Sequence, residues 1–269
     1  MTAETYKVYA VRYGTRDARR HEHFVFRDAH DGPMPMDYFV WAIVGATRTL
    51  VVDTGYGKAE GEGRGRTFLR CPTEGLRAVG IEAEEVADVI ITHLHYDHGG
   101  NLDKFPGARF HVQDAEIAYA TGRPMTHRVI RSAYTVDHVT DMVRLVHGER
   151  VVFHQGDDVI APGIRVHHIG GPTRGLQAVS VDTARGKVVL ASDACHYYAN
   201  MDEGNPFPIV DSVTDMLEGH RRLLKIADSP DHIVPGHDPE VMRRYPAASA
   251  DAEGIAVSLH ETPMETGNT

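Results

Sequence analysis

The sequence predicts a single α/β domain that spans residues 1–269. Short runs of apolar, often β-branched residues alternate along the chain with segments of helical pattern, which is typical of an α/β fold. No linker-like stretch divides these segments into separate parts, so we expect one body. A hydrophobic fraction of 42% over 269 residues is ample for a sizeable core.

The expected elements follow from this alternation. Strands are expected at 6–13, 23–26, 38–44, 49–52, 89–91, 108–112, 151–153, 158–160, 164–169, 178–182, 187–190 and 232–234, and helices at 73–79 and 212–227. Irregularly spaced glycines predict a flexible loop at 56–70 with no phosphate-binding pattern. A helical insertion at about 114–145 is long for a crossover and fits either a lid or packing against the core. The tail after about 257 is polar and expected to fray.

Composition excludes several classes of function. A formal net charge of −10 argues against nucleic-acid binding, which needs a basic face. Two cysteines cannot form a disulfide framework, which fits a reducing compartment. No stretch approaches the roughly 20 apolar residues of a membrane span, and the N-terminus has no signal-peptide pattern. We therefore expect a soluble, cytoplasmic protein with no membrane partner; its oligomeric state, a homodimer included, stays open.

The most informative stretch is Thr92-His93-Leu94-His95-Tyr96-Asp97-His98-Gly99-Gly100. It follows the apolar run Val89-Ile90-Ile91 directly, so it is predicted to be a loop at the end of a buried strand. On such a loop His93 and His95 can face one point while Asp97 and His98 face a neighbouring one. Nitrogen and oxygen donors gathered this tightly are what a Zn²⁺-like ion needs.

Other strand ends supply further donors. Asp193 follows the run at 187–190, and His237 follows the run at 232–234. Asp53 also ends a strand, where it is either an acceptor that orients the metal loop or a turn-forming residue. Loops of this kind can converge on one edge of a sheet sandwich.

These residues resemble the ligand set of the metallo-β-lactamase superfamily, and within it the N-acyl-homoserine lactonase and 4-pyridoxolactonase group. The resemblance implies an αββα four-layer sandwich with a two-metal site. It assigns His93 and His95 to the first metal, Asp97, His98 and His237 to the second, and Asp193 as a bridge between them. Two Zn²⁺ ions are expected, with Mn²⁺, Fe²⁺ or Co²⁺ as alternatives.

The chain departs from this pattern at Pro172. The remaining first-metal ligand of the family is a histidine in a Gly-His-Thr-x-Gly loop, which here is Gly171-Pro172-Thr173-Arg174-Gly175. His168 lies about 13 Å away along an extended chain, so it could substitute only if the loop were rebuilt. The alternatives are a first metal held more weakly by His93, His95, Asp193 and water, or a largely empty site.

The resemblance implies a metal-dependent hydrolase whose metal-bound hydroxide opens a lactone of the N-acyl-homoserine kind, as in quorum quenching, or cleaves a carboxylic ester. Asp97 is expected to pass a proton to the leaving alkoxide, and His196 or Tyr198 to donate a hydrogen bond to the oxyanion. Thioester, β-lactam or phosphodiester hydrolysis, and a catalytically impaired relative, remain alternatives. No Gly-x-Ser-x-Gly elbow supports a serine hydrolase.

Overall fold

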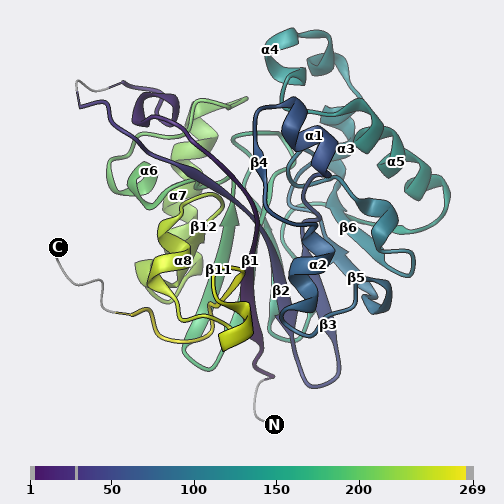
Figure 1. Cartoon of the computed structure of the whole chain (residues 1–269). Helices are drawn as coiled ribbons and strands as arrows, with labels where there is room; N and C mark the ends of the chain where they lie inside the picture. The colour runs from purple at the N-terminus through teal and green to yellow at the C-terminus, as the bar shows by residue number, and fades with distance from the viewer. Residues whose placement is uncertain (1–3, 28–29, 265–269) are drawn as a thin grey trace.

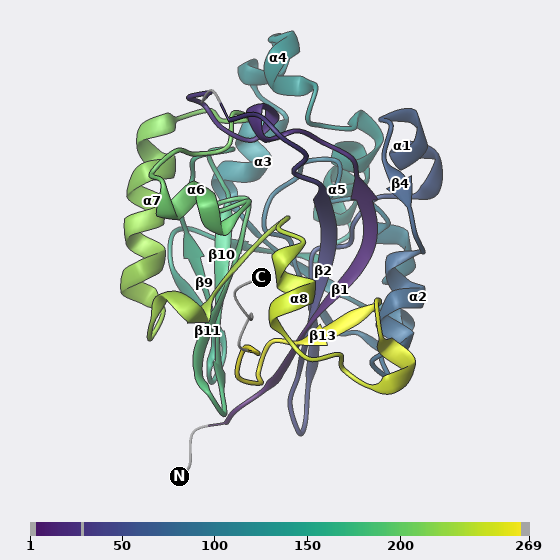
Figure 2. The ribbon, with the colours of Figure 1, turned by 60° about the vertical axis from the view of Figure 1, so that its left-hand side comes forward.

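Two mixed β-sheets lie face to face, and helices cover their outer faces (Figures 1 and 2). The computed structural model describes residues 4–27 and 30–264. In spatial order the larger sheet holds β13 (Ala256–Ser258), β1 (Lys7–Arg16), β2 (Met36–Val44), β3 (Thr49–Val52), β5 (Asp88–Ile90), β6 (Arg109–Gln113) and β7 (Val151–His154), with β4 (Thr67–Phe68) beside β1. The smaller sheet holds β12 (Ile233–Pro235), β11 (Gly186–Ser192), β10 (Gln177–Thr183), β9 (Ile164–His168) and β8 (Asp158–Ala161).

Three hydrophobic layers separate the four layers of structure. On β2 the side chains of Tyr38 and Val40 join the core under the helices, while those of Phe39 and Trp41 join the core between the sheets. This is the pattern of a strand buried on both faces, where successive side chains point to opposite sides. The αββα sandwich predicted by the resemblance is therefore confirmed.

The helices cover the outer faces of the two sheets, except that α8 packs against the core between them. They are α1 (Lys58–Gly63), α2 (Pro72–Arg77), α3 (Asp114–Ala120), α4 (Arg128–Arg131), α5 (Val136–His147), α6 (Tyr198–Asp202), α7 (Val213–Ile226) and α8 (Glu240–Arg244). Leu76 of α2 and Met142 of α5 pack on the larger sheet, and Leu223 of α7 packs on the smaller one. Ser212 caps α7, because its hydroxyl accepts the Asp215 backbone N–H at 3.1 Å. No helix in the described part of the chain is long and apolar enough to cross a membrane.

Short 3-10 turns complete the chain. They lie at η1 (Arg20–Glu22), η2 (Ala83–Glu85), η3 (Leu102–Lys104), η4 (Arg123–Thr126), η5 (Pro230–His232) and η6 (Ala250–Ala252).

Two segments differ from the expected elements. The strand expected at 23–26 is wrong: the Val25 N–H donates to the Pro206 carbonyl at 2.9 Å, so this segment pairs with a loop instead of a sheet. The loop expected at 56–70 contains α1 and β4. Both are short elements fixed by contacts distant in sequence, which a local pattern does not encode.

The predicted insertion and tail can also be placed. Between Asp114 and His147 the chain forms α3, η4, α4 and α5, and α4 projects from the top of the molecule (Figures 1 and 2). The fraying expected after about 257 is wrong for residues 257–264. β13 pairs with β1, and the Met264 N–H donates to the Arg244 carbonyl at 2.7 Å; residues 265–269 lie outside the described part.

Candidate metal centre

The histidine-rich loop leaves β5 and turns inside the protein. β3 and β5 are parallel neighbours, so Asp53 at the end of β3 lies beside Thr92. The Asp53 carboxylate accepts the Thr92 backbone N–H at 2.7 Å, the Thr92 hydroxyl at 2.8 Å and His98 Nδ1–H at 2.7 Å. Asp53 therefore anchors the loop, and one of its histidines directly, as the first of its two predicted roles requires.

Asp193 lies at the end of β11, and imidazoles surround its carboxylate on two sides. Its Oδ1 is 3.1 Å from His98 Nε2 and 2.9 Å from His237 Nε2. Its Oδ2 is 3.4 Å from His93 Nε2 and 3.9 Å from His95 Nδ1. The two oxygens thus face two different pairs of histidines, which is the arrangement of a carboxylate that bridges two ions.

Asp97 completes the Oδ1 side. Its carboxylate lies 3.7 Å from His98 Nε2 and 3.8 Å from His237 Nε2. The backbone carbonyl of Asp97 accepts the Tyr13 hydroxyl at 2.7 Å, which fixes this end of the loop. Asp97, His98 and His237 offer ligand atoms within 4.8 Å of one another, so the structure brings the three predicted second-metal ligands together.

The pKa values of the buried histidines and acids in the centre are set by burial and by the opposite charges beside them. Burial lowers the pKa of His93 well below its ordinary value. Burial acts on His98 in the same direction, but three nearby carboxylates, Asp193 first, outweigh it and raise the pKa of His98. Burial raises the pKa of Asp193, but the imidazoles around it hold that pKa well below the usual range. An ionised acid thus lies among imidazoles, and a divalent cation bound there would displace the proton that the raised pKa keeps on His98.

The donor set fits a metal ion. The Nε2 atoms of His93 and His98 are buried and make no hydrogen bond within the described residues, although buried polar atoms normally have partners. Both atoms lie beside Asp193. Imidazole nitrogens and carboxylate oxygens are ligands that Zn²⁺ and similar ions take.

The Pro172 loop lies beside the centre without donating to it. Glu116 joins the two: its carboxylate accepts the Leu94 backbone N–H at 2.9 Å and the Thr173 hydroxyl at 2.5 Å. A Cβ at Gly175 would lie 2.1 Å from the Glu116 backbone nitrogen, so only glycine allows this approach. None of the candidate clusters among the described residues includes a member of this loop.

The histidines before Pro172 are engaged elsewhere. His167 lies 3.1 Å from an Asp157 carboxylate oxygen and 2.9 Å from the Ser180 hydroxyl. His168 Nε2 lies 2.7 Å from the Arg174 carbonyl oxygen and therefore donates to it. The loop has not been rebuilt to bring His168 to the metal centre.

The two predicted oxyanion donors, His196 and Tyr198, lie in different environments. His196 Nε2 lies 3.2 Å from Asp193 Oδ2, inside the centre. Tyr198 packs against the core between the sheets, and the Arg244 guanidinium lies 4.0 Å from its ring centroid. The contacts of its ring are with this core and with Arg244, not with the metal ligands, and its role as an oxyanion donor stays a prediction. Cys195 is buried, and its thiol lies 3.1 Å from the Tyr197 carbonyl oxygen.

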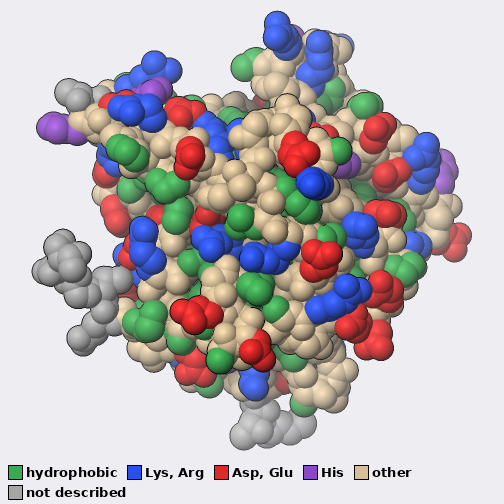
Figure 3. All heavy atoms as spheres, in the orientation of Figure 1, with side chains coloured by type: hydrophobic (Ala, Val, Ile, Leu, Met, Phe, Trp, Pro, Cys, Tyr) green, Lys and Arg blue, Asp and Glu red, His purple; other side chains and the backbone are tan. Residues whose placement is uncertain are grey.

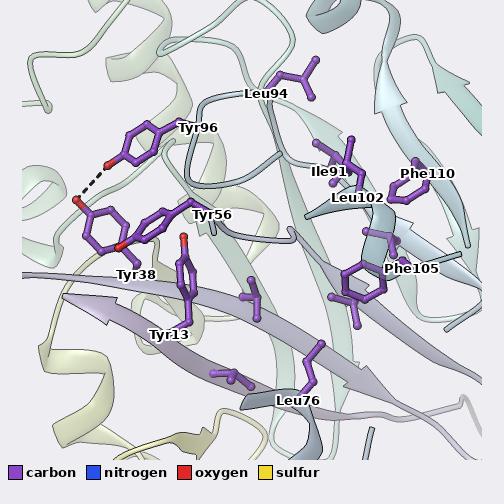
Figure 4. Close-up of a cluster of buried hydrophobic side chains, with 14 of the residues drawn as sticks. Tyr13, Tyr38, Tyr56, Leu76, Ile91, Leu94, Tyr96, Leu102, Phe105 and Phe110 are labelled. Atoms are coloured by element: carbon purple, nitrogen blue, oxygen red, sulfur yellow. Dashed lines mark hydrogen bonds between the residues drawn. The ribbon is translucent and has the colours of Figure 1, made fainter. Parts of the chain in front are cut away.

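Two aromatic side chains lie against the centre, and of these only Tyr134, which belongs to the insertion predicted as a lid or pocket wall, could be expected from the sequence. The ring of Tyr134 meets His95 edge-on at 4.9 Å, and the ring of Tyr38 meets His237 edge-on at 5.2 Å. Tyr38 belongs to a group of four tyrosines, and its hydroxyl accepts that of Tyr96 at 3.2 Å (Figure 4). Glu116 was missed as well. No local pattern marks Tyr38 or Glu116, because they reach the centre through the tertiary fold.

The sequence is similar to those of known metallo-hydrolases and lactonases. The sequence model of the metallo-beta-lactamase superfamily matches residues 34–245. A probable metallo-hydrolase of Mycobacterium tuberculosis is 26% identical over 221 residues, which cover 72% of this chain and 68% of the relative. An N-acyl homoserine lactonase of a Bacillus species is 28% identical over 170 residues, or 62% of each chain.

Solved structures show the same fold. A quorum-quenching N-acyl homoserine lactone lactonase superimposes with a TM-score of 0.72 at 21% identity, covering 89% of this chain and 94% of that one. A probable metal-dependent hydrolase from Staphylococcus aureus also gives a TM-score of 0.72, at 15% identity, over 98% and 96% of the two chains. With the matched residues spanning most of the sequence and the buried histidine–aspartate clusters in place, the chain belongs to the metallo-beta-lactamase superfamily.

Proposed function

We propose that this protein is a metal-dependent hydrolase that opens lactones carrying an acyl chain, or cleaves related carboxylic esters. The observation that carries the proposal is the Asp193 carboxylate, whose two oxygens face two separate groups of imidazoles. Two Zn²⁺-like ions bound there would polarise a carbonyl and lower the pKa of a water molecule. The lactonases among the similar proteins support a lactone as the substrate.

A side chain of the protein would transfer the proton that the leaving alkoxide needs. Asp97 is 7% exposed, the largest value among the six predicted ligands, so it is the one that best faces an entering substrate. Its carboxylate would accept a proton and return it to the leaving alkoxide oxygen. His93, His98 and Asp193 would orient the reacting atoms and keep bulk water out, because each is at most 3% exposed.

A cavity with a partly apolar wall lies beside Tyr134, and its size and lining would suit an acyl chain. It has a volume of about 610 Å³ and is lined in part by Met125, Val136 and Val139 of the insertion. Tyr134 forms part of its wall and also contacts His95. A substrate could therefore place its reactive carbonyl near the metal ligands and its alkyl chain along this wall.

A substrate panel tests the proposal. Metal-free protein would be reconstituted with Zn²⁺, Mn²⁺ or Co²⁺ and assayed against acyl lactones, simple esters, an acyl thioester, a β-lactam and a phosphodiester. We expect acyl lactones to give the highest kcat/KM, and chelation to abolish it. Absence of lactone and ester hydrolysis with all three metals would refute the proposal.

A second candidate is an acyl thioester with an anionic carrier. Arg64, Arg128 and Arg131 line the same cavity, and within the described residues neither Arg128 nor Arg131 forms an ion pair. Figure 3 shows Lys and Arg side chains gathered on the projecting segment that contains α4. One similar protein is an acyl-coenzyme A thioesterase of Gallus gallus, 26% identical over 219 residues.

The arginines distinguish the two substrates. Changing Arg128 and Arg131 to Ser should raise KM for an acyl-coenzyme A about 10-fold or more if they bind its phosphates. KM for an uncharged acyl lactone should change little. Arg123→Ser serves as the control, because Arg123 lies in η4 but does not line the cavity.

A further inference from the structure

We propose that His196 supplies the third imidazole of the first metal site, in place of the histidine that Pro172 excludes. The inference rests on the proposed function only in that metal binds at this centre. It replaces the role expected from sequence, in which His196 donates a hydrogen bond to the oxyanion.

The position of His196 relative to Asp193 is the first argument. Its Nε2 lies 3.2 Å from Oδ2, the same oxygen that faces His93 Nε2 at 3.4 Å and His95 Nδ1 at 3.9 Å. Oδ1 faces only His98 and His237 among the described histidines. Each carboxylate oxygen is thus served by a set of three side chains: three imidazoles at Oδ2, and two imidazoles with Asp97 at Oδ1.

The surroundings of His196 hold its ring in place. The ring stacks on Phe207 with centroids 3.7 Å apart and planes 3° from parallel. The backbone carbonyl of His196 accepts the His237 N–H at 3.0 Å, which ties it to another ligand. The side chain is only 3% exposed. His196, Asp193 and His237 also offer ligand atoms within 4.8 Å of one another. These contacts hold the ring beside Asp193 Oδ2, at the border of the two groups of imidazoles.

The other candidates for a third ligand are engaged. His168 donates to the Arg174 carbonyl, His167 lies between Asp157 and Ser180, and the Thr173 hydroxyl donates to Glu116. Pro172 has no donor side chain. Within the described residues, His196 is therefore the imidazole at Oδ2 that is not already assigned to a metal by the family pattern.

His196 should nevertheless be a weaker ligand than its neighbours. Its Nδ1 is buried and makes no hydrogen bond within the described residues. By contrast, His98 and His237 donate through Nδ1 to Asp53 and to the Asp37 carbonyl. Losing such an outer partner typically lowers metal affinity about 10–100-fold. The first site should therefore release its metal before the second.

The test is a Co²⁺ titration of the metal-free protein, followed by visible absorption and by metal analysis of each chain. His196→Phe preserves the stack on Phe207 but removes both nitrogens, and His196→Gln provides a polar variant should the first not fold. We expect wild type to bind two Co²⁺ ions with unequal affinity. In either His196 variant the weaker site should lose at least about 10-fold in affinity, while the tighter site is unchanged. His168→Gln is the matched control and should bind as wild type does.

Restoring a ligand completes the test. Adding Pro172→His to His196→Phe should bring back the weaker site, because a histidine would again stand in the loop. Two Co²⁺ ions bound by both His196 variants with wild-type affinities and spectra would overturn the inference. A wild type that binds two ions but hydrolyses nothing in the substrate panel would instead refute the proposed function and leave this inference standing.

Discussion

At the scale of single residues, the centre depends on partners that orient each imidazole. His93 Nδ1 lies 3.1 Å from the Thr92 hydroxyl, so its Nε2 is turned towards Asp193. His237 donates through Nδ1 to the Asp37 carbonyl at 2.9 Å, which leaves its Nε2 to accept a metal. A side chain held by such partners loses little conformational freedom on binding.

Replacing Asp193 with Asn should remove metal from both sites. The amide keeps the shape but loses the charge that faces two groups of imidazoles, so affinity for both ions should fall by at least about 10–100-fold. Metal content after dialysis, measured by atomic emission, checks this. Asp202→Asn, at the exposed end of α6, is the control. Retention of both metals by the Asp193 variant would rule out a bridging role.

At the scale of elements, loops at strand ends form the centre, and hydrogen bonds to helix α3 connect two of these loops. α3 carries Glu116, which is fully buried and accepts hydrogen bonds from Leu94 in the metal loop, from Thr173 beside Pro172, and from the Tyr134 hydroxyl at 3.1 Å. All three donate to the carboxylate, whereas a carboxamide could keep its place only if a hydroxyl turned round to accept from its N–H₂ group.

Glu116→Gln should therefore destabilise the fold and loosen the metal loop. The carboxamide would lose the charge that strengthens these hydrogen bonds and would force the Thr173 hydroxyl to reverse its direction, which costs about 1–3 kcal/mol. Urea unfolding of the metal-free protein measures the loss, and Glu84→Gln, at an exposed site in η2, should change stability by less than about 0.5 kcal/mol. Equal stability of the two variants would show that Glu116 does not hold the loops together.

The features predicted from the sequence are those that neighbouring residues encode. The loop after β5 could be read because His93, His95, Asp97 and His98 follow one buried strand, and the defect at Pro172 could be read as a missing donor. The directions of the side chains that follow Asp193 could not be predicted from the sequence. His196 enters the centre and Tyr198 leaves it, since α6 begins at Tyr198 and turns its ring towards Arg244.

At the scale of the whole molecule, burial makes stability depend on pH. Burial lowers the pKa of His220 on α7 to about 4. The ordinary value is 6.5, so between pH 6.5 and 4 the unfolded chain binds a proton that the folded chain does not. Stability is therefore greatest above pH 6.5 and falls as the pH drops through this window.

His220→Leu should remove part of this acid sensitivity. Between pH 7 and pH 4.5 the variant should lose less unfolding free energy than wild type, by about 1–3 kcal/mol. Thermal or urea unfolding of the metal-free proteins at several pH values measures the difference. Parallel curves for the two proteins would mean that His220 does not contribute to the pH dependence.

The central claim is that side chains from three separate strand ends converge on a pair of metal ions. Anomalous X-ray diffraction from zinc-loaded crystals, recorded on both sides of the zinc absorption edge, tests it most directly. The account predicts two peaks roughly 3.5–4 Å apart that share Asp193. The stronger should lie among Asp97, His98 and His237, and the weaker among His93, His95 and His196. Zinc bound elsewhere, with no peak beside Asp193, would contradict the account.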